Sequence, residues 1–187
     1  MNKIQGEFLL LCMVKLDRSG NNLLNNAGGF LNAYTYRMLL VQGYQQNDVI
    51  HNQNLNLLAR WTPLACGCFG TLGLILGSPA YFWALGFLTL LGAIGSRSFY
   101  DYLYQLFLRP LTGLGDMPLH GAPRRFGCAI GAVLFLLSGT GFYMQSPLLS
   151  FIPALIIIPL AFVAAITQWC FASTLYRLIF GKKLDCC

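Results

Sequence analysis

The stretch "WTPLACGCFGTLGLILGSPAYFWALGFLTLLGAIG", residues 61–95, contains no Asp, Glu, Lys or Arg. As one helix it would be roughly 50 Å long, because a helix rises about 1.5 Å per residue. The hydrocarbon core of a bilayer is only ~30 Å thick. Ser78 and Pro79 fall near the middle of the stretch, and proline disfavours a continuing helix. The stretch therefore predicts two membrane-spanning helices, 61–77 and 80–95, joined by a tight turn.

A second uncharged stretch, residues 126–170, has the same organisation. Its apolar segments, 126–144 and 149–170, flank a turn that contains Ser146 and Pro147. Each pair of segments is preceded by an arginine next to an aromatic residue. We therefore predict an all-α integral membrane protein with four transmembrane helices, arranged as two antiparallel hairpins.

The overall composition agrees with a protein solvated by lipid. The 187 residues are 56% hydrophobic and only 10% charged, whereas a soluble domain carries about 25% charged residues. The net charge of +6 arises from short basic segments between apolar runs. These basic segments lack the clustered patches, interleaved with aromatic residues, that nucleic-acid binders have. The expected partner is the bilayer, with a further membrane protein or a second copy of the chain as alternatives, and no nucleic acid.

The distribution of charge predicts the topology. Every Lys, Arg, Asp and Glu lies before Trp61, between Gly95 and Phe126, or after Cys170. Four spans place these three zones on one face of the membrane, and cytoplasmic loops are rich in Lys and Arg. Both termini and the central loop are therefore expected in the cytoplasm.

The segments outside the spans are less informative. Residues 1–51 form a poorly defined N-terminal segment, cytoplasmic or interfacial, in which Met13 and Met38 are alternative starts. Residues 52–180 form the membrane domain. In its central loop, 98–109 predicts an interfacial helix that ends before Pro110, because tyrosines recur along one side. Residues 181–187 are a short tail that is basic and rich in cysteine.

The sequence has seven cysteines, and their spacing resembles neither a zinc site nor a disulfide framework. Four lie in the predicted spans: Cys66, Cys68, Cys128 and Cys170. At about 1.5 Å per residue, all four fall in the cytoplasmic half of the bilayer. Cysteine packs as a small hydrophobe, so the cluster is either packing or a candidate thiol site that handles electrons or sulfur.

The central loop contains candidate contacts for an anion or a lipid headgroup: Arg109, His120, Arg124 and Arg125. Arginine suits bidentate contacts with phosphate, sulfate and carboxylate groups, and basic pockets near spans bind headgroups. Alternatively, the arginines only set the topology and His120 forms hydrogen bonds within the loop.

No motif in the chain indicates catalysis, a metal or a cofactor. No charged residue lies inside a predicted span, which argues against an ion pathway. The glycine pairs Gly73/Gly77 and Gly127/Gly131 have the spacing that lets helices approach closely. The sequence therefore favours a protein that is not an enzyme, and it predicts no cofactor.

Four stretches of residues ~52–180 are distinctive: "NQNLNLLARW" (52–61), "RSFYDYLYQLFLRPLTG" (97–113), "APRRFGCAIGAV" (122–133) and "TQWCFASTLYRL" (167–178). On these stretches the chain resembles DUF4395, a family of small bacterial membrane proteins of unknown function. The resemblance implies a membrane protein of bacterial origin and adds no mechanism. Family members often carry a Cys-x-x-Cys-like pair in the last element, where this chain has Cys170 and then Ser173.

Three functional hypotheses follow. The first is a non-enzymatic scaffold or accessory subunit, because catalytic motifs and intramembrane charge are absent. The second is a thiol-based redox or sulfur-handling protein that uses the cysteines of the cytoplasmic leaflet. The third is an oligomeric transporter of small solutes.

Overall fold

The computed structural model describes residues 33–45, 49, 54–95, 97–113, 115–116 and 119–180. Most of the N-terminal segment and the whole 181–187 tail lie outside this part. All regular elements of the described part are helices. In chain order they are α2 (Ala33–Val41), α4 (Leu55–Leu76), α5 (Pro79–Ile94), α6 (Phe99–Leu103), the π-helix η1 (Tyr104–Leu108), α7 (Arg109–Thr112), α8 (Ala122–Tyr143), α9 (Pro147–Thr167) and α10 (Phe171–Phe180).

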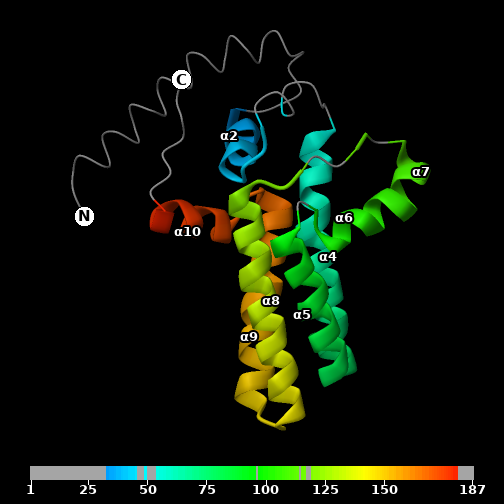
Figure 1. Ribbon diagram of the computed structural model, residues 1–187, viewed down its shortest axis with the longest axis vertical. Coiled ribbons are helices and arrows are strands. Elements are labelled where there is room, and N and C mark those ends of the chain that lie inside the picture. Colours follow the sequence, from blue (N-terminus) through cyan, green and yellow to red (C-terminus); the bar gives the residue numbers. More distant parts are fainter. Residues whose placement is uncertain are drawn as a thin grey trace, which may run out of the picture.

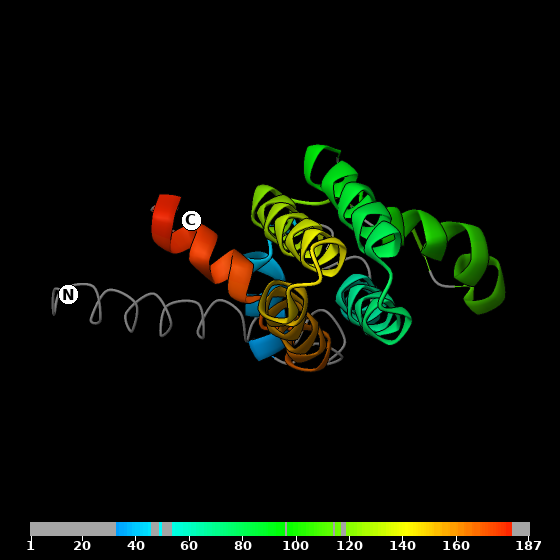
Figure 2. The ribbon, with the colours of Figure 1, turned by 90° about the horizontal axis from the view of Figure 1, so that it is seen from below.

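The four long helices α4, α5, α8 and α9 form an antiparallel bundle (Figure 1). The turns between α4 and α5 and between α8 and α9 lie at the same end of this bundle, whereas α2 and α10 lie at the other end. Seen along the bundle in Figure 2, α5 pairs with α8, and α4 pairs with α9. The two helices of the first hairpin touch each other far less than they touch the second hairpin.

Large aromatic side chains fill the centre of the bundle. Phe82 of α5 and Phe135 of α8 are fully buried, and the ring of Phe82 stacks on that of Phe142 at 5.3 Å. Ile158 of α9 completes this core from the other side. Close approach of the helices depends on glycine at Gly141, where a Cβ atom would lie 2.3 Å from the backbone of α9.

Two helices of the described part are long and apolar enough to cross a membrane, α8 with 22 residues and α9 with 21. A third span results if α5 and the segment 99–112 are counted together, although these are bent by 93°. On its own, α5 has only 16 residues. The 22 residues of α4 have the length, but Asn56, Arg60 and Pro63 dilute its apolar character.

The outside of the bundle is apolar. Ile75, Leu91, Ile94 and Ile166 are each more than 60% exposed, and similar side chains continue along α8 and α9. A water-soluble protein rarely leaves so much contiguous apolar surface uncovered. This exterior is typical of helices that face lipid.

Two helical segments leave the bundle sideways near the same end. The segment α6–η1–α7 extends to one side, and α10 extends to the other (Figures 1 and 2). Arg177 of α10 donates a hydrogen bond from Nη2 to the Leu40 carbonyl at 2.8 Å, which ties α10 to α2. Partial burial lowers the pKa of Arg177. Exposed apolar side chains on both segments, among them Leu111 and Leu178, are typical of helices at a lipid–water boundary.

The helix bounds differ from the predicted ones at two prolines. The central helical segment does not end before Pro110 but continues to Thr112, because the preceding π-helix and the start of α7 accommodate a residue without an N–H. The third predicted span, 126–144, begins earlier, at Ala122, because Pro123 fits in the first turn of α8 after extended backbone at Gly121.

The last predicted span, 149–170, is divided by a break. Helix α9 ends at Thr167, Gln168 adopts a left-handed conformation with φ of 59°, and α10 begins at Phe171. Cys170 therefore lies in the break between two helices and not at the end of a continuous one.

Candidate functional site

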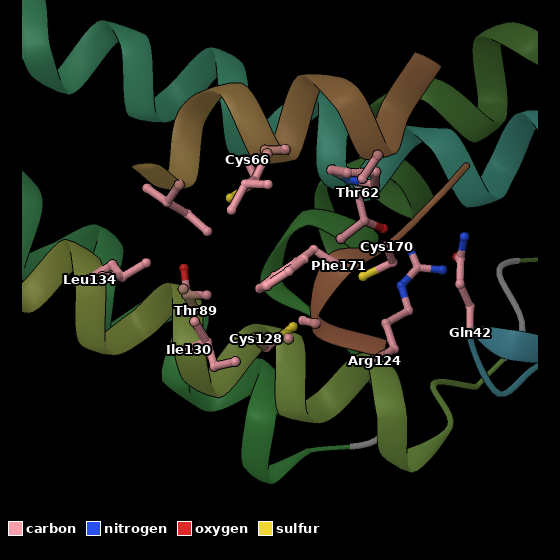
Figure 3. A pocket seen from close by; sticks show the side chains of 18 of the residues that line it. Gln42, Thr62, Cys66, Thr89, Arg124, Cys128, Ile130, Leu134, Cys170 and Phe171 are labelled. Carbon is pink, nitrogen blue, oxygen red and sulfur yellow. The ribbon is translucent and has the colours of Figure 1, made fainter. Parts of the chain in front are cut away.

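A cavity of about 230 Å³ lies between α4, α8, α9 and α10. Its lining is mostly apolar, with polar groups concentrated at the end near α2 (Figure 3). It is the strongest candidate for a functional site because it brings together residues that are far apart in the sequence.

Three of the four candidate thiols line this cavity. Cys66 comes from α4, Cys128 from α8 and Cys170 from the α9–α10 break, and their sulfur atoms point into the same space (Figure 3). Cys68 is exposed on the outside of the bundle, because two residues correspond to more than half a turn of helix. All four are free thiols.

Arg124 forms the polar end of the cavity, from the first turn of α8. Its side chain is only 8% exposed. Nη2 donates a long hydrogen bond of 3.4 Å to the Ala59 carbonyl, and the guanidinium lies 5.2 Å from the centre of the Tyr44 ring. Nη1 is buried and has no hydrogen-bond partner among the described residues. The cavity thus contains a cation with donor capacity to spare.

Gln168 holds the break that places Cys170 at the cavity. The buried side chain donates from Nε2 to the Asn56 carbonyl at 3.0 Å and also contacts Asn56 Oδ1. The Gln168 carbonyl accepts a 2.6 Å hydrogen bond from Nε2 of Gln42, which lines the cavity. These bonds connect α2, α4 and the α9–α10 break around the polar end.

The opposite end of the cavity is apolar. Leu134 of α8 lies at this end (Figure 3), and Ile156, Ile157 and Leu160 of α9 also line the cavity. The hydroxyls of Thr89 and Tyr100 also line the cavity and lie 3.3 Å apart, and Thr89 donates to the Leu85 carbonyl at 2.7 Å. The cavity is therefore amphipathic along its length.

The remaining candidate anion contacts lie away from the cavity. Arg109 forms an exposed ion pair with Asp116, with Nη1 and Oδ1 2.6 Å apart. Arg125 is not among the lining residues. Nε2 of His120 lies 2.9 Å from Asp101 Oδ2, in a fully buried pair. Of the four residues, only Arg124 faces the thiols.

Asp101 is the important residue that the sequence analysis did not single out. It caps α6, because its side chain accepts a hydrogen bond from the Ser98 backbone N–H while the Ser98 hydroxyl accepts one from Tyr100. The signal was present in the sequence as Ser98-x-x-Asp101, the spacing of a capping box. Thr62 of α4 also donates to it at 2.7 Å.

The chemistry open to this site is that of thiols and a cation. Over the residues that the structure describes, no group of three or more His, Cys, Asp or Glu is arranged to hold a metal ion. Among the described lining residues, cysteine sulfur comes from three elements, α4, α8 and the α9–α10 break.

These features define the class: an all-helical protein, over its described part, with two helices able to cross a membrane. The chain belongs to the family described as Domain of unknown function (DUF4395), whose model matches residues 56–180. This match confirms the resemblance noted in the sequence. It runs from the first turn of α4 to the end of α10 and includes every cavity residue except Gln42. No curated protein and no solved structure matches the chain.

Proposed function

We propose that this protein is a four-span protein of the bacterial inner membrane that carries out thiol chemistry in its internal cavity. The observation that carries the proposal is the convergence of Cys66, Cys128 and Cys170 on one cavity that also contains Arg124. The four spans are α4, α5, α8 and α9. The end of the bundle that carries α2 and α10 faces the cytoplasm.

The distribution of charge supports this topology. Between Trp61 and Gly95, and between Phe126 and Cys170, the chain has no charged residue. Arginines occur near the start of α4, in the first turn of α8 and in α10. The starts of α4 and α8, and α10 itself, lie toward the end of the bundle that carries α2 (Figure 1). Because positive residues concentrate on the cytoplasmic side of a membrane, this end is the cytoplasmic one. The α6–α7 segment and α10 then lie along the inner interface.

The reaction that we propose is thiol–disulfide exchange with a small organic disulfide. One cavity cysteine attacks the disulfide bond, a mixed disulfide forms and one small thiol leaves with a proton. A second cavity cysteine attacks the protein sulfur of this mixed disulfide, and the second small thiol leaves. Two protein thiols are thereby oxidised to a disulfide, and the small disulfide is reduced to two thiols.

The cavity favours this function over the other two hypotheses. A scaffold or accessory subunit needs no internal space, and a buried cation inside it would only lower its stability. A transporter needs a polar path through the bundle, whereas Leu134, Ile156 and Ile157 make one end of the cavity apolar. Thiol chemistry uses the three cysteines that line this internal space.

A neutral dipyridyl disulfide tests the proposal, since its leaving thiol absorbs light. The starting protein has Ser in place of Cys12, Cys186 and Cys187, and it is reconstituted in lipid vesicles. Intact mass should then reveal the loss of two hydrogens to an internal disulfide, and peptide mapping should assign this disulfide to two of the residues Cys66, Cys128 and Cys170. The variants C66S, C128S and C170S are compared with C68S, the matched control from the outer face of α4.

We expect C68S to behave like the starting protein. At least one cavity variant should retain a pyridyl adduct, because the second cysteine needed to release it is missing. Cavity thiols that stay inert while Cys68 reacts would overturn the proposal, as would identical products from all four variants. Either result would leave the scaffold hypothesis as the better one.

A further inference from the structure

We propose that the cavity binds an amphiphilic anion, with its charged head at Arg124 and its hydrocarbon body between α8 and α9. The inference names the class of ligand for the cavity in which we place the thiol chemistry, and it rests on that proposed function only for the location. It requires no reaction of the cysteines.

The unsatisfied guanidinium is the first observation. Arg124 is buried, and arginine stays protonated in proteins. Its one hydrogen bond among the described residues, to the Ala59 carbonyl, is long at 3.4 Å, and Nη1 has no partner there. A buried cation is costly unless an anion pairs with it. A bound anionic group would satisfy both the charge and the free N–H donors.

The carboxylates of the described part are already engaged elsewhere. Asp101 accepts hydrogen bonds from Thr62 and Ser98 and lies against His120. Asp116 pairs with Arg109 at the surface. Within the cavity, the Gln42 amide and the thiols of Cys128 and Cys170 lie near Arg124 (Figure 3). None of these groups is a permanent negative charge, so the site has room for an external anion.

The apolar end defines the rest of the ligand. From Arg124 the cavity continues past Cys128 toward Leu134 (Figure 3). Ile156 and Leu160 of α9 also line it. A small inorganic anion would leave that end without contacts, whereas a hydrocarbon chain would fill it. The shared chemistry is therefore an anionic head on an apolar body. A fatty carboxylate and an anionic membrane lipid both have it.

Dodecanoate is the probe for this site, and dodecanol is its neutral match. Native mass spectrometry of the full chain, released from a non-ionic detergent, counts bound probe in each protein. We compare the wild type with R124M, R124K and R109Q, where Arg109 is the exposed arginine that pairs with Asp116. Removing one partner of a buried charge pair weakens binding by about tenfold or more.

The proposal expects dodecanoate to bind the wild type and R109Q alike, and R124M at least about tenfold more weakly. R124K keeps the positive charge but loses the planar guanidinium with its paired N–H donors, so its affinity for dodecanoate should lie between those of the wild type and R124M. Equal binding of dodecanol and dodecanoate would overturn the proposal, and so would unchanged dodecanoate binding to R124M. If R124M does not fold, R124K and the comparison of the two probes decide the question.

Two further experiments distinguish a membrane lipid from a free amphiphile as the ligand, and the anion proposal from the thiol proposal. Nanodiscs of phosphatidylglycerol and of phosphatidylcholine are compared for protection of Cys170 against N-ethylmaleimide, with Cys68 as the internal control. Protection by phosphatidylglycerol alone identifies a membrane lipid, and protection only by added dodecanoate identifies a free amphiphile. A chain with C66S, C128S and C170S must still bind dodecanoate. If it does while the dipyridyl disulfide test fails, only the thiol proposal falls.

Discussion

Asp101 Oδ2 lies 2.9 Å from His120 Nε2, and neither side chain is exposed to solvent. The pair connects α6 to the segment that enters α8. Thr62 adds α4 to the same network through its 2.7 Å hydrogen bond to Oδ1 of Asp101. Three separate parts of the chain thus meet at one carboxylate, close to the end of the bundle that holds the cavity.

Replacing Asp101 with Ala should destabilise the protein strongly. Removing one member of a buried pair leaves the other without its partner, which typically costs about 3–5 kcal/mol. The free energy of unfolding can be measured by titration with sodium dodecyl sulfate in mixed micelles, followed by tryptophan fluorescence. In a double-mutant cycle, H120A should add little once Asp101 is gone.

The matched control for this prediction is D116A. Asp116 also pairs with a basic residue, Arg109 at 2.6 Å, but the two side chains are 62% and 48% exposed. An exposed ion pair contributes less than about 1 kcal/mol. Equal losses in D101A and D116A would contradict the buried network.

The close approach of α8 and α9 near their turn predicts that G141A is destabilised. A Cβ atom at Gly141 would lie 2.3 Å from the backbone atoms of Leu149 and Ser150, which cannot move without displacing α9. Overpacking of this kind costs about 1–3 kcal/mol. The same detergent titration measures it.

G131A serves as the comparison, since a Cβ atom there would have its nearest neighbour at 3.6 Å, the methyl group of Thr89. Its stability should stay within about 1 kcal/mol of the wild type. A G141A variant as stable as G131A would show that the two helices do not pack in this way.

The division of the chain into helices could largely be predicted from charge alone. Uncharged runs longer than a single span, each interrupted by Ser-Pro, require helices that fold back. The exact starts could not be predicted, because Asn56 and Arg60 precede the apolar run of α4, yet they form its first turns. Gly77 was interpreted as part of a packing motif, whereas it ends α4 with φ of 59°.

The candidate site could be predicted only in outline. The depth of the cysteines along their spans could be predicted from residue counts. The sequence could not predict which of Cys66 and Cys68 faces the cavity, because that depends on which face of α4 packs on α9. Arg109 and Arg124 both lie next to a proline in a polar segment. Only tertiary structure distinguishes the exposed pair of Arg109 from the buried position of Arg124.

The two glutamines with left-handed backbone should respond in opposite ways to glycine. Gln145 (φ 53°) is exposed in the α8–α9 turn, and Gln168 (φ 59°) is buried in the α9–α10 break. Glycine relieves about 1–2 kcal/mol of backbone strain at either position. We expect Q145G to be as stable as the wild type or slightly more stable.

Q168G should instead lose stability, because the side-chain hydrogen bonds to Asn56 disappear and the part-buried Asn56 carbonyl loses this donor. The same variant should increase the rate at which N-ethylmaleimide modifies Cys170, since the break is no longer anchored. If Q168G and Q145G gain the same stability, the side chain of Gln168 does not hold the break.

The proposed topology predicts which parts of the chain are reached from outside the cell. In a chain whose cysteines are replaced by serine, single cysteines are introduced at Gln145, at Ser78 and at Thr112, the exposed end of α7. A membrane-impermeant maleimide added to intact bacteria should label the first two, since both turns lie at the far end of the bundle. Thr112 should be labelled only after permeabilisation.

If α8 and α9 alone cross the membrane, position 78 will instead be protected together with position 112. Labelling of position 78 thus distinguishes two spans from four, and equal labelling of positions 145 and 112 in intact cells would contradict any crossing by α8.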